Sequence, residues 1–148
     1  MQAQNNALNR LNYLVGETEA LYHDMAYHMG LSGSAMRILY ALCDNGERCL
    51  LRLLCRRSGL SKQTVNSALR KLEQEGIVYL EAAGARAKEV CLTQKGRELT
   101  RRTVVPVMEM ENAVFAGWDP REVQDYLAYT ERFLRDMKQQ VAARQEHP

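Results

Sequence analysis

Polar and basic residues recur along one face of the helix that we expect over residues 61–75. The residues on this face and at the helix start are Ser61, Lys62, Gln63, Thr64, Asn66, Ser67, Arg70 and Lys71. Lysine and arginine side chains can bind phosphate groups, whereas amides and hydroxyls can hydrogen-bond to base edges in a major groove. This face therefore has the chemistry of a surface that binds DNA.

An apolar face on the same segment would hold the polar face outward. Its residues lie at positions i, i+3, i+4 and i+7 of a helical pattern, and they are Val65, Ala68, Leu69 and Leu72. Ser61 can cap the helix start by accepting a hydrogen bond from an amide of the first turn, and Gly76 ends the helix. The pattern predicts a helix that is packed on one side and open to solvent on the other.

A shorter helix is expected just before it, over residues 50–58. Gly59 follows at a position where a helix commonly ends with a positive φ angle. Two helices joined by such a tight turn predict a helix-turn-helix. The apolar residues that we expect to face inward on the shorter helix are Leu50, Leu51, Leu53 and Leu54.

Two short β-prone runs follow, over residues 77–81 and 88–92. The connecting residues 82–87 are small, and they predict a hairpin of the kind called a wing. Arg86 at its tip could enter a minor groove, and Lys88 lies at its base. For an isolated hairpin, an exposed arginine without a partner would be the simpler interpretation. Beside a basic helix, we favour a DNA contact.

Charge is unevenly distributed along the chain, although 20 lysines and arginines against 18 acidic residues give a net charge of only +2. Between Arg48 and Arg102 there are 13 basic and 5 acidic residues, so a basic centre lies between acidic ends. This distribution is typical of a local polyanion-binding surface. Chance clustering on a solvated surface is the alternative.

The composition suits a single globular domain with extensions. The chain has 148 residues and a hydrophobic fraction of 46%, which argues against disorder. It has no run of about 18 uncharged apolar residues, and its polar N-terminus lacks the apolar stretch of a signal peptide. We therefore expect a cytoplasmic protein that does not bind membranes.

Catalysis and metal binding find little support in the sequence. His23 and His28 would lie about 140° apart around a helix, and the only other histidine is His147. The four cysteines form no CxxC pair, and there is no Gly-rich phosphate loop or nucleophile motif. We expect no enzymatic activity, no metal and no cofactor. Among the cysteines, Cys49 and Cys55 would be the ones to test for redox sensing.

Several residues predict where the other helices begin and end. Ser32 or Ser34 can cap a core helix. Thr93 can cap a long helix, which Pro106 would kink because it lacks an amide hydrogen. Asp119, followed by proline and later glutamate, predicts a capping box at the start of the last helix.

Heptad patterns mark both ends of the chain and predict helix-on-helix packing. The two patterns could pack on each other within one monomer. We favour a homodimer, because the paired half-sites that helix-turn-helix proteins read require two-fold symmetry. Candidate interface residues are Leu8, Leu11, Val15, Val123, Leu127, Leu134 and Met137.

The order of elements and two segments, SGLSKQTVNSALRKLEQEGIV and GARAKEVCLTQKG, resemble the MarR family of bacterial winged helix-turn-helix transcriptional regulators. The likeness extends over roughly residues 8–141. In that family the wing commonly reads Asp-x-Arg, then a strand, then Leu-Thr-x-x-Gly. Arg86, Leu92, Thr93 and Gly96 match, whereas Gly84 stands where the aspartate is expected. That aspartate commonly helps to orient the wing arginine, so we expect this wing to be less well anchored than the recognition helix.

These observations and the resemblance predict a mainly α fold with a small β-hairpin wing. Within a single domain of residues 1–148, residues 31–97 would form the winged helix-turn-helix that binds DNA. Residues 1–30 and 98–148 would form the helical dimerisation part.

Many family members release DNA when a small phenolic or other amphipathic compound binds. The resemblance implies a dimer on DNA, and we expect a homodimeric regulator that binds double-stranded DNA sequence-specifically, either a repressor or an activator; of the two, we favour a repressor. A protein-interaction module with the same fold and no DNA binding is the alternative. Candidate residues for an effector pocket, which equally suit ordinary core and interface packing, are Tyr13, Tyr22, Met25, Met29, Met36, Tyr40 and Met108.

Overall fold

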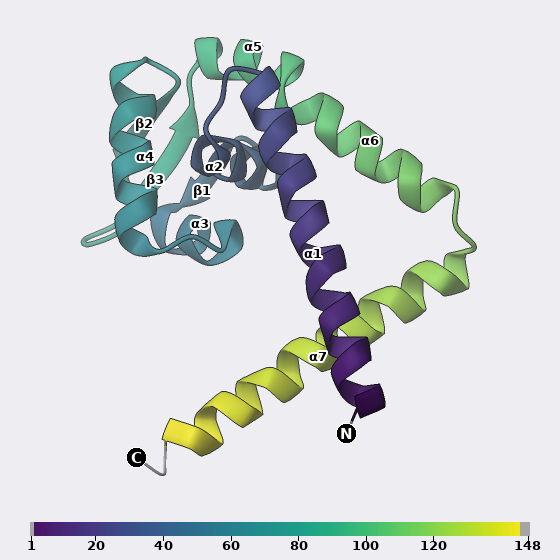
Figure 1. Cartoon of the computed structure of the whole chain (residues 1–148). Helices are drawn as coiled ribbons and strands as arrows, with labels where there is room; N and C mark the ends of the chain where they lie inside the picture. The colour runs from purple at the N-terminus through teal and green to yellow at the C-terminus, as the bar shows by residue number, and fades with distance from the viewer. Residues whose placement is uncertain (1, 146–148) are drawn as a thin grey trace. The chain divides into compact units, whose positions relative to one another are not determined.

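The structure, a computed structural model, describes residues 2–145, and for residues 2–5 it describes the backbone alone (Figure 1). The described chain divides between Val107 and Met108 into two compact units. None of its helices is long and apolar enough to cross a membrane. The predicted fold class, mainly α with a small hairpin, is confirmed. The elements are, in order, α1 (Gln2–His28), α2 (Gly33–Asp44), β1 (Arg48–Leu50), α3 (Leu51–Ser58), α4 (Lys62–Gln74), β2 (Val78–Ala82), β3 (Lys88–Leu92), α5 (Gln94–Arg102), α6 (Val104–Ala116) and α7 (Pro120–Gln145).

Helix α2 forms the centre of the first unit. It contacts α1, α3, α4, β1 and β3, and Figure 1 shows it surrounded by these elements. Its side chains Ile38, Leu39 and Leu42 are completely buried, and this burial of apolar surface is the main stabilising contribution. Ser32, one of the two serines proposed as the cap, accepts a hydrogen bond from the amide of Ala35 at 3.1 Å.

A three-stranded antiparallel sheet, in the order β1-β3-β2, joins the helices. Strand β1 was not predicted, and the expectation that Leu50 faces inward is wrong. Leu50 ends β1 with 39% of its surface exposed, and α3 begins one residue later. A strand of three residues is too short to show the alternation of apolar and polar residues that predicts a strand. Its partner β3, in which Cys91 lies opposite Arg48, is far away in the sequence, so local patterns did not reveal the pairing.

Helix α3 packs less deeply than predicted. Of the leucines expected to face inward, only Leu54 is completely buried, whereas Leu51 and Leu53 are half-buried. The turn after the helix agrees with the prediction, because Gly59 has a φ angle of 68°. A left-handed backbone of this kind favours glycine.

Helix α4 has well-defined ends, as predicted. The hydroxyl of Ser61 accepts a hydrogen bond from the amide of Thr64 at 3.1 Å. At the other end Gly76 has a φ angle of 73°, and the amide of Ile77 donates to the carbonyl of Leu72 at 2.9 Å. These contacts satisfy backbone groups that a helix end leaves unpaired.

The single kinked helix expected after Thr93 is in fact two helices, α5 and α6. Pro106 cannot donate a hydrogen bond to the carbonyl of Arg102, and its ring would clash with that carbonyl. Helix α5 therefore ends at Arg102. The hydroxyl of Thr103 instead donates to the carbonyl of Leu99 at 2.7 Å.

The second unit contains most of α6 and all of α7. The predicted capping box is present, because the amide of Arg121 donates to the carboxylate of Asp119 at 2.8 Å and the amide of Asp119 donates to Glu122 at 3.1 Å. No described residue of α7 is buried. Three aromatic rings pack edge to face around the turn between the helices: Phe115, Trp118 and Tyr126.

Candidate nucleic-acid interface

The outward face of α4 carries the polar residues predicted to contact nucleic acid. They form two rows at four-residue spacing, so they share one side of the helix. One row is Lys62, Asn66 and Arg70, and the other is Gln63, Ser67 and Lys71; all are exposed except the half-buried Asn66. The opposite side is buried through Val65, Leu69 and Leu72. The core thus fixes the orientation of the polar face.

The cations on this face have no acidic partner in the described part of the chain. Lys62, Arg70 and Lys71 take part in none of its ion pairs. They lie on the helix together with amide and hydroxyl groups. This combination can bind phosphates and hydrogen-bond to base edges at the same time.

Other cations of the basic centre have partners inside the protein. Arg97 pairs with Glu47 at 2.7 Å, and Arg57 lies 3.4 Å from Asp44. Lys95 donates to a backbone carbonyl, that of Glu75, at 2.8 Å. A count of charges along the sequence cannot separate these residues from those that remain free.

Two predicted contact residues, Ser61 and Thr64, are engaged at the start of α4. Their hydroxyl oxygens lie 2.8 Å apart and share a hydrogen bond. Ser61 also accepts from the amide of Thr64. Both hydroxyls thus stabilise the helix start in this structure.

Strands β2 and β3 form the predicted wing. Their pairing runs from Val78 opposite Leu92 to Ala82 opposite Lys88, and the amide of Ala83 beyond it donates to a carbonyl across the hairpin at 2.9 Å. The strands therefore stay paired almost to the tip.

The wing tip presents the predicted cations to solvent. Arg86 and Lys88 are both exposed and unpaired in the described chain. Gly84 has a φ angle of 87°, which glycine adopts without strain. An aspartate at this position would be strained, so the glycine suits the backbone found here.

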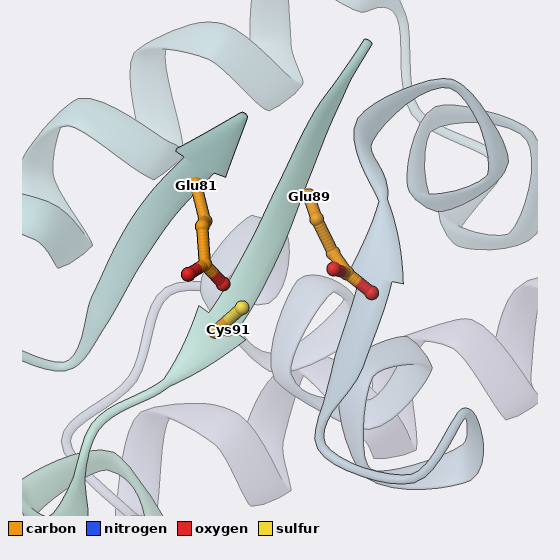
Figure 2. A group of neighbouring side chains, drawn as sticks. All are labelled: Glu81, Glu89 and Cys91. Atoms are coloured by element: carbon orange, nitrogen blue, oxygen red, sulfur yellow. The ribbon is translucent and has the colours of Figure 1, made fainter. Parts of the chain in front are cut away.

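The paired strands of the wing hold a charged group, close to the loop, that was not predicted from the sequence. Glu81 of β2 and Glu89 of β3 lie opposite each other, next to Cys91 (Figure 2). Nη2 of Arg48 lies 2.9 Å from a carboxylate oxygen of each glutamate. The proximity of the glutamates and the cysteine was predictable from the sequence, because residues 89 and 91 share one face of a strand. The pairing with Arg48 was not predictable, because β1 was not predicted.

Hydrogen bonds within this group change two pKa values. The bond to Glu89 raises the pKa of Arg48 above its ordinary value. The hydrogen bond with Cys91 raises the pKa of the Tyr79 phenol. Two carboxylates and a thiol within 4.8 Å of one another are donors that a divalent cation can use. Here both carboxylates already accept hydrogen bonds from Arg48.

Most of the residues proposed for an effector pocket come together in the first unit. Tyr22, Met25, Met29 and Tyr40 pack against a buried cluster that includes Met36. Two proposed residues do not join it: Tyr13 is 75% exposed, and Met108 belongs to the second unit.

The candidate interface residues are exposed, with one exception. The exposed fractions of six of them lie between 40% and 55% in the single chain, and Val123 is half-buried. The six are Leu8, Leu11, Val15, Leu127, Leu134 and Met137.

The remaining candidate groups are histidines and cysteines. His23 lies against Gly33, and the ring of His28 packs edge to face on Tyr27; His147 lies outside the described residues. Burial raises the pKa of the Cys43 thiol and that of Cys49. A raised pKa lowers the fraction of reactive thiolate at Cys49. Cys55 is half-buried.

Residues 29–88, which include α2, both helices of the helix-turn-helix and most of the wing, match the sequence model of the MarR family. No curated protein matches the chain. Among solved structures, a MarR family regulator from Neisseria meningitidis, NMB1585, superposes with a TM-score of 0.81 at 17% identity, covering 92% of this chain and 96% of that chain.

Two other solved structures extend the comparison. A transcriptional regulator of the MarR family from Silicibacter pomeroyi has a TM-score of 0.70 at 26% identity, covering 88% of each chain. The MepR–DNA complex of S. aureus has a TM-score of 0.68 at 17% identity, covering 87% of this chain and 96% of that chain. Residues 29–88 are thus similar to the MarR family, and these likenesses show that the chain has the winged-helix fold of the three solved structures.

Proposed function

We propose that this protein is a homodimeric repressor that binds double-stranded DNA in a sequence-specific manner. The observation that carries the proposal is the outward face of α4, where Lys62, Arg70 and Lys71 are unpaired beside amide and hydroxyl groups. Such a helix can enter a major groove, while Arg86 on the wing contacts the adjacent minor groove. The structural likeness to MepR, which was solved bound to DNA, supports this arrangement.

The proposed dimer would use the terminal helices. Helix α7 has 26 residues and none is buried, although Leu127, Leu134 and Met137 repeat along it. An apolar stripe of this length is unfavourable in water. Burying it against the same surface of a second copy would remove it from solvent, and a two-fold dimer carries one recognition helix for each of two DNA half-sites.

A dimer bound to two successive major grooves would block access to a promoter, and for this reason we propose that the protein represses transcription. We propose that it acts in the cytoplasm. We further propose that a small amphipathic compound releases it by binding near the cluster of Tyr22, Met25 and Met36, whose flexible apolar side chains can adapt to a ligand. A simple phenolic acid, 4-hydroxybenzoate, is a suitable first probe. Loss of DNA binding on its addition would support this part.

The test of DNA binding is an electrophoretic mobility shift with the region upstream of the protein's own gene. We expect a shift at low salt that survives excess unrelated DNA and weakens steeply as salt rises, because phosphate contacts release counterions. No shift at low salt, together with recovery of a stable protein partner, would instead favour a protein-interaction module.

A further inference from the structure

Two acidic residues face each other across the wing. Glu81 of β2 and Glu89 of β3 are register partners, and Figure 2 shows both side chains on the same side of the sheet. Like charges directly opposite each other destabilise an antiparallel pair. The hairpin alone would therefore pair poorly at this position, next to its last residue pair before the loop.

Arg48 supplies the missing positive charge from outside the hairpin. It belongs to β1, and a single nitrogen, Nη2, lies 2.9 Å from both Glu81 and Glu89. The guanidinium thus connects all three strands of the sheet. Because the two carboxylates share one cation, their mutual repulsion is offset only while β1 stays paired with β3.

We propose that Arg48 is a positioning residue for the wing. By pairing with both Glu81 and Glu89, it offsets their repulsion, keeps β2 and β3 paired and so holds Arg86 in place. We call this contact the clamp; it lies one residue pair before the last pair of a hairpin whose tip carries Gly84 rather than a side chain that could orient the arginine. The consequence for DNA rests on the proposed function, whereas the effect on the hairpin does not.

Amide hydrogen exchange measured by NMR on the full-length protein tests the clamp without DNA. In Arg48→Ala the wing amides, including that of Ala83, should exchange about three to ten times faster, since removing two exposed charge pairs has effects of this size. Amides of α2 should keep their rates. Arg57→Ala in α3 removes a similarly exposed pair with Asp44 of α2 and should leave the wing unchanged.

The decisive comparison repeats Arg48→Ala in a protein that also carries Glu81→Gln and Glu89→Gln. Glutamine keeps the size of the side chain and removes the repulsion, so Arg48→Ala should now change wing exchange by less than about two-fold. Equal acceleration in both backgrounds would show that Arg48 acts by packing, and it would overturn the proposal. So would unchanged exchange in Arg48→Ala alone.

DNA affinity gives a separate readout. If both proposals hold, Arg48→Ala weakens DNA binding, and the two glutamine substitutions restore it. If the hydrogen-exchange rates show charge coupling but no variant binds DNA, the role of Arg48 in the wing is supported and the proposed function is contradicted. DNA binding without charge coupling would contradict the clamp alone.

Discussion

Pairing within the protein separates basic residues that stabilise the fold from those that are free to contact DNA. Arg97 and Arg57 are each paired with an acidic side chain, whereas Arg70 on the outward face of α4 is not. A free cation on a helix that is fixed by its buried side can approach a phosphate without breaking an existing contact. We therefore assign more of the proposed DNA affinity to Arg70 than to the paired arginines.

Replacing Arg70 by alanine should weaken DNA binding about tenfold and reduce the slope of log affinity against log salt by about 1, because one phosphate contact is lost. Fluorescence anisotropy over a range of salt concentrations measures both quantities. Arg132→Ala serves as the control, since Arg132 is an exposed arginine of α7 whose partner is Asp136. Equal losses in the two variants would contradict the role given to Arg70.

Gly96 is a residue where packing, and not backbone angle, requires glycine. A Cβ atom at this position would clash with the backbone carbonyl of Ile77. Gly96→Ala should therefore lower the free energy of unfolding by about 1–3 kcal/mol, as overpacking does. Chemical denaturation measures this change. Gly16→Ala, where a Cβ meets nothing within 4 Å, should be neutral or stabilising, and a similar loss there would contradict the explanation.

Among the elements, helix starts that a side chain caps were predictable and long-range pairing was not. The caps at Ser61 and Thr93 depend on residues three positions apart, so the sequence contains the whole signal. Strand β1 has three residues, and its hydrogen-bonding partner β3 begins only at Lys88. For this reason α4 and the wing were predicted, and the contact of Arg48 with Glu81 and Glu89 was not.

Substitutions at Ser61 can separate the stability of α4 from DNA binding. Ser61→Ala removes the cap and should lower the free energy of unfolding by about 1 kcal/mol. Ser61→Asp should keep the cap, since aspartate is also a strong N-cap residue. It should nevertheless weaken DNA binding, because it places a negative charge at the proposed interface. Thermal unfolding and anisotropy measure the two effects, and equal affinity of Ser61→Asp and the native protein would contradict the placement of this helix end near DNA.

In the whole molecule, exposed apolar residues lie along both α1 and α7. Heptad spacing predicted these positions, and six of the seven are 40–55% exposed. Spacing alone could not show which partner covers them, because packing within a monomer and between monomers needs the same pattern. We propose a second copy of the chain.

The dimer is tested by Leu127→Glu combined with Leu134→Glu. Burying these carboxylates at the interface would be costly, so we expect a monomer by analytical ultracentrifugation at concentrations where the native protein is a dimer. Tyr129→Glu is the control, because it is an exposed residue on the opposite side of α7. A double variant that remains dimeric would exclude this stripe as the interface.

Sequence-specific DNA binding by a dimer is tested most directly by selecting bound DNA from a pool of random oligonucleotides with the full-length protein. We expect enrichment of a palindrome whose half-site centres lie about 10–11 base pairs apart, because two symmetry-related α4 helices would enter successive major grooves on one side of the duplex. Absence of any enriched sequence, or enrichment of a single site without two-fold symmetry, would contradict it.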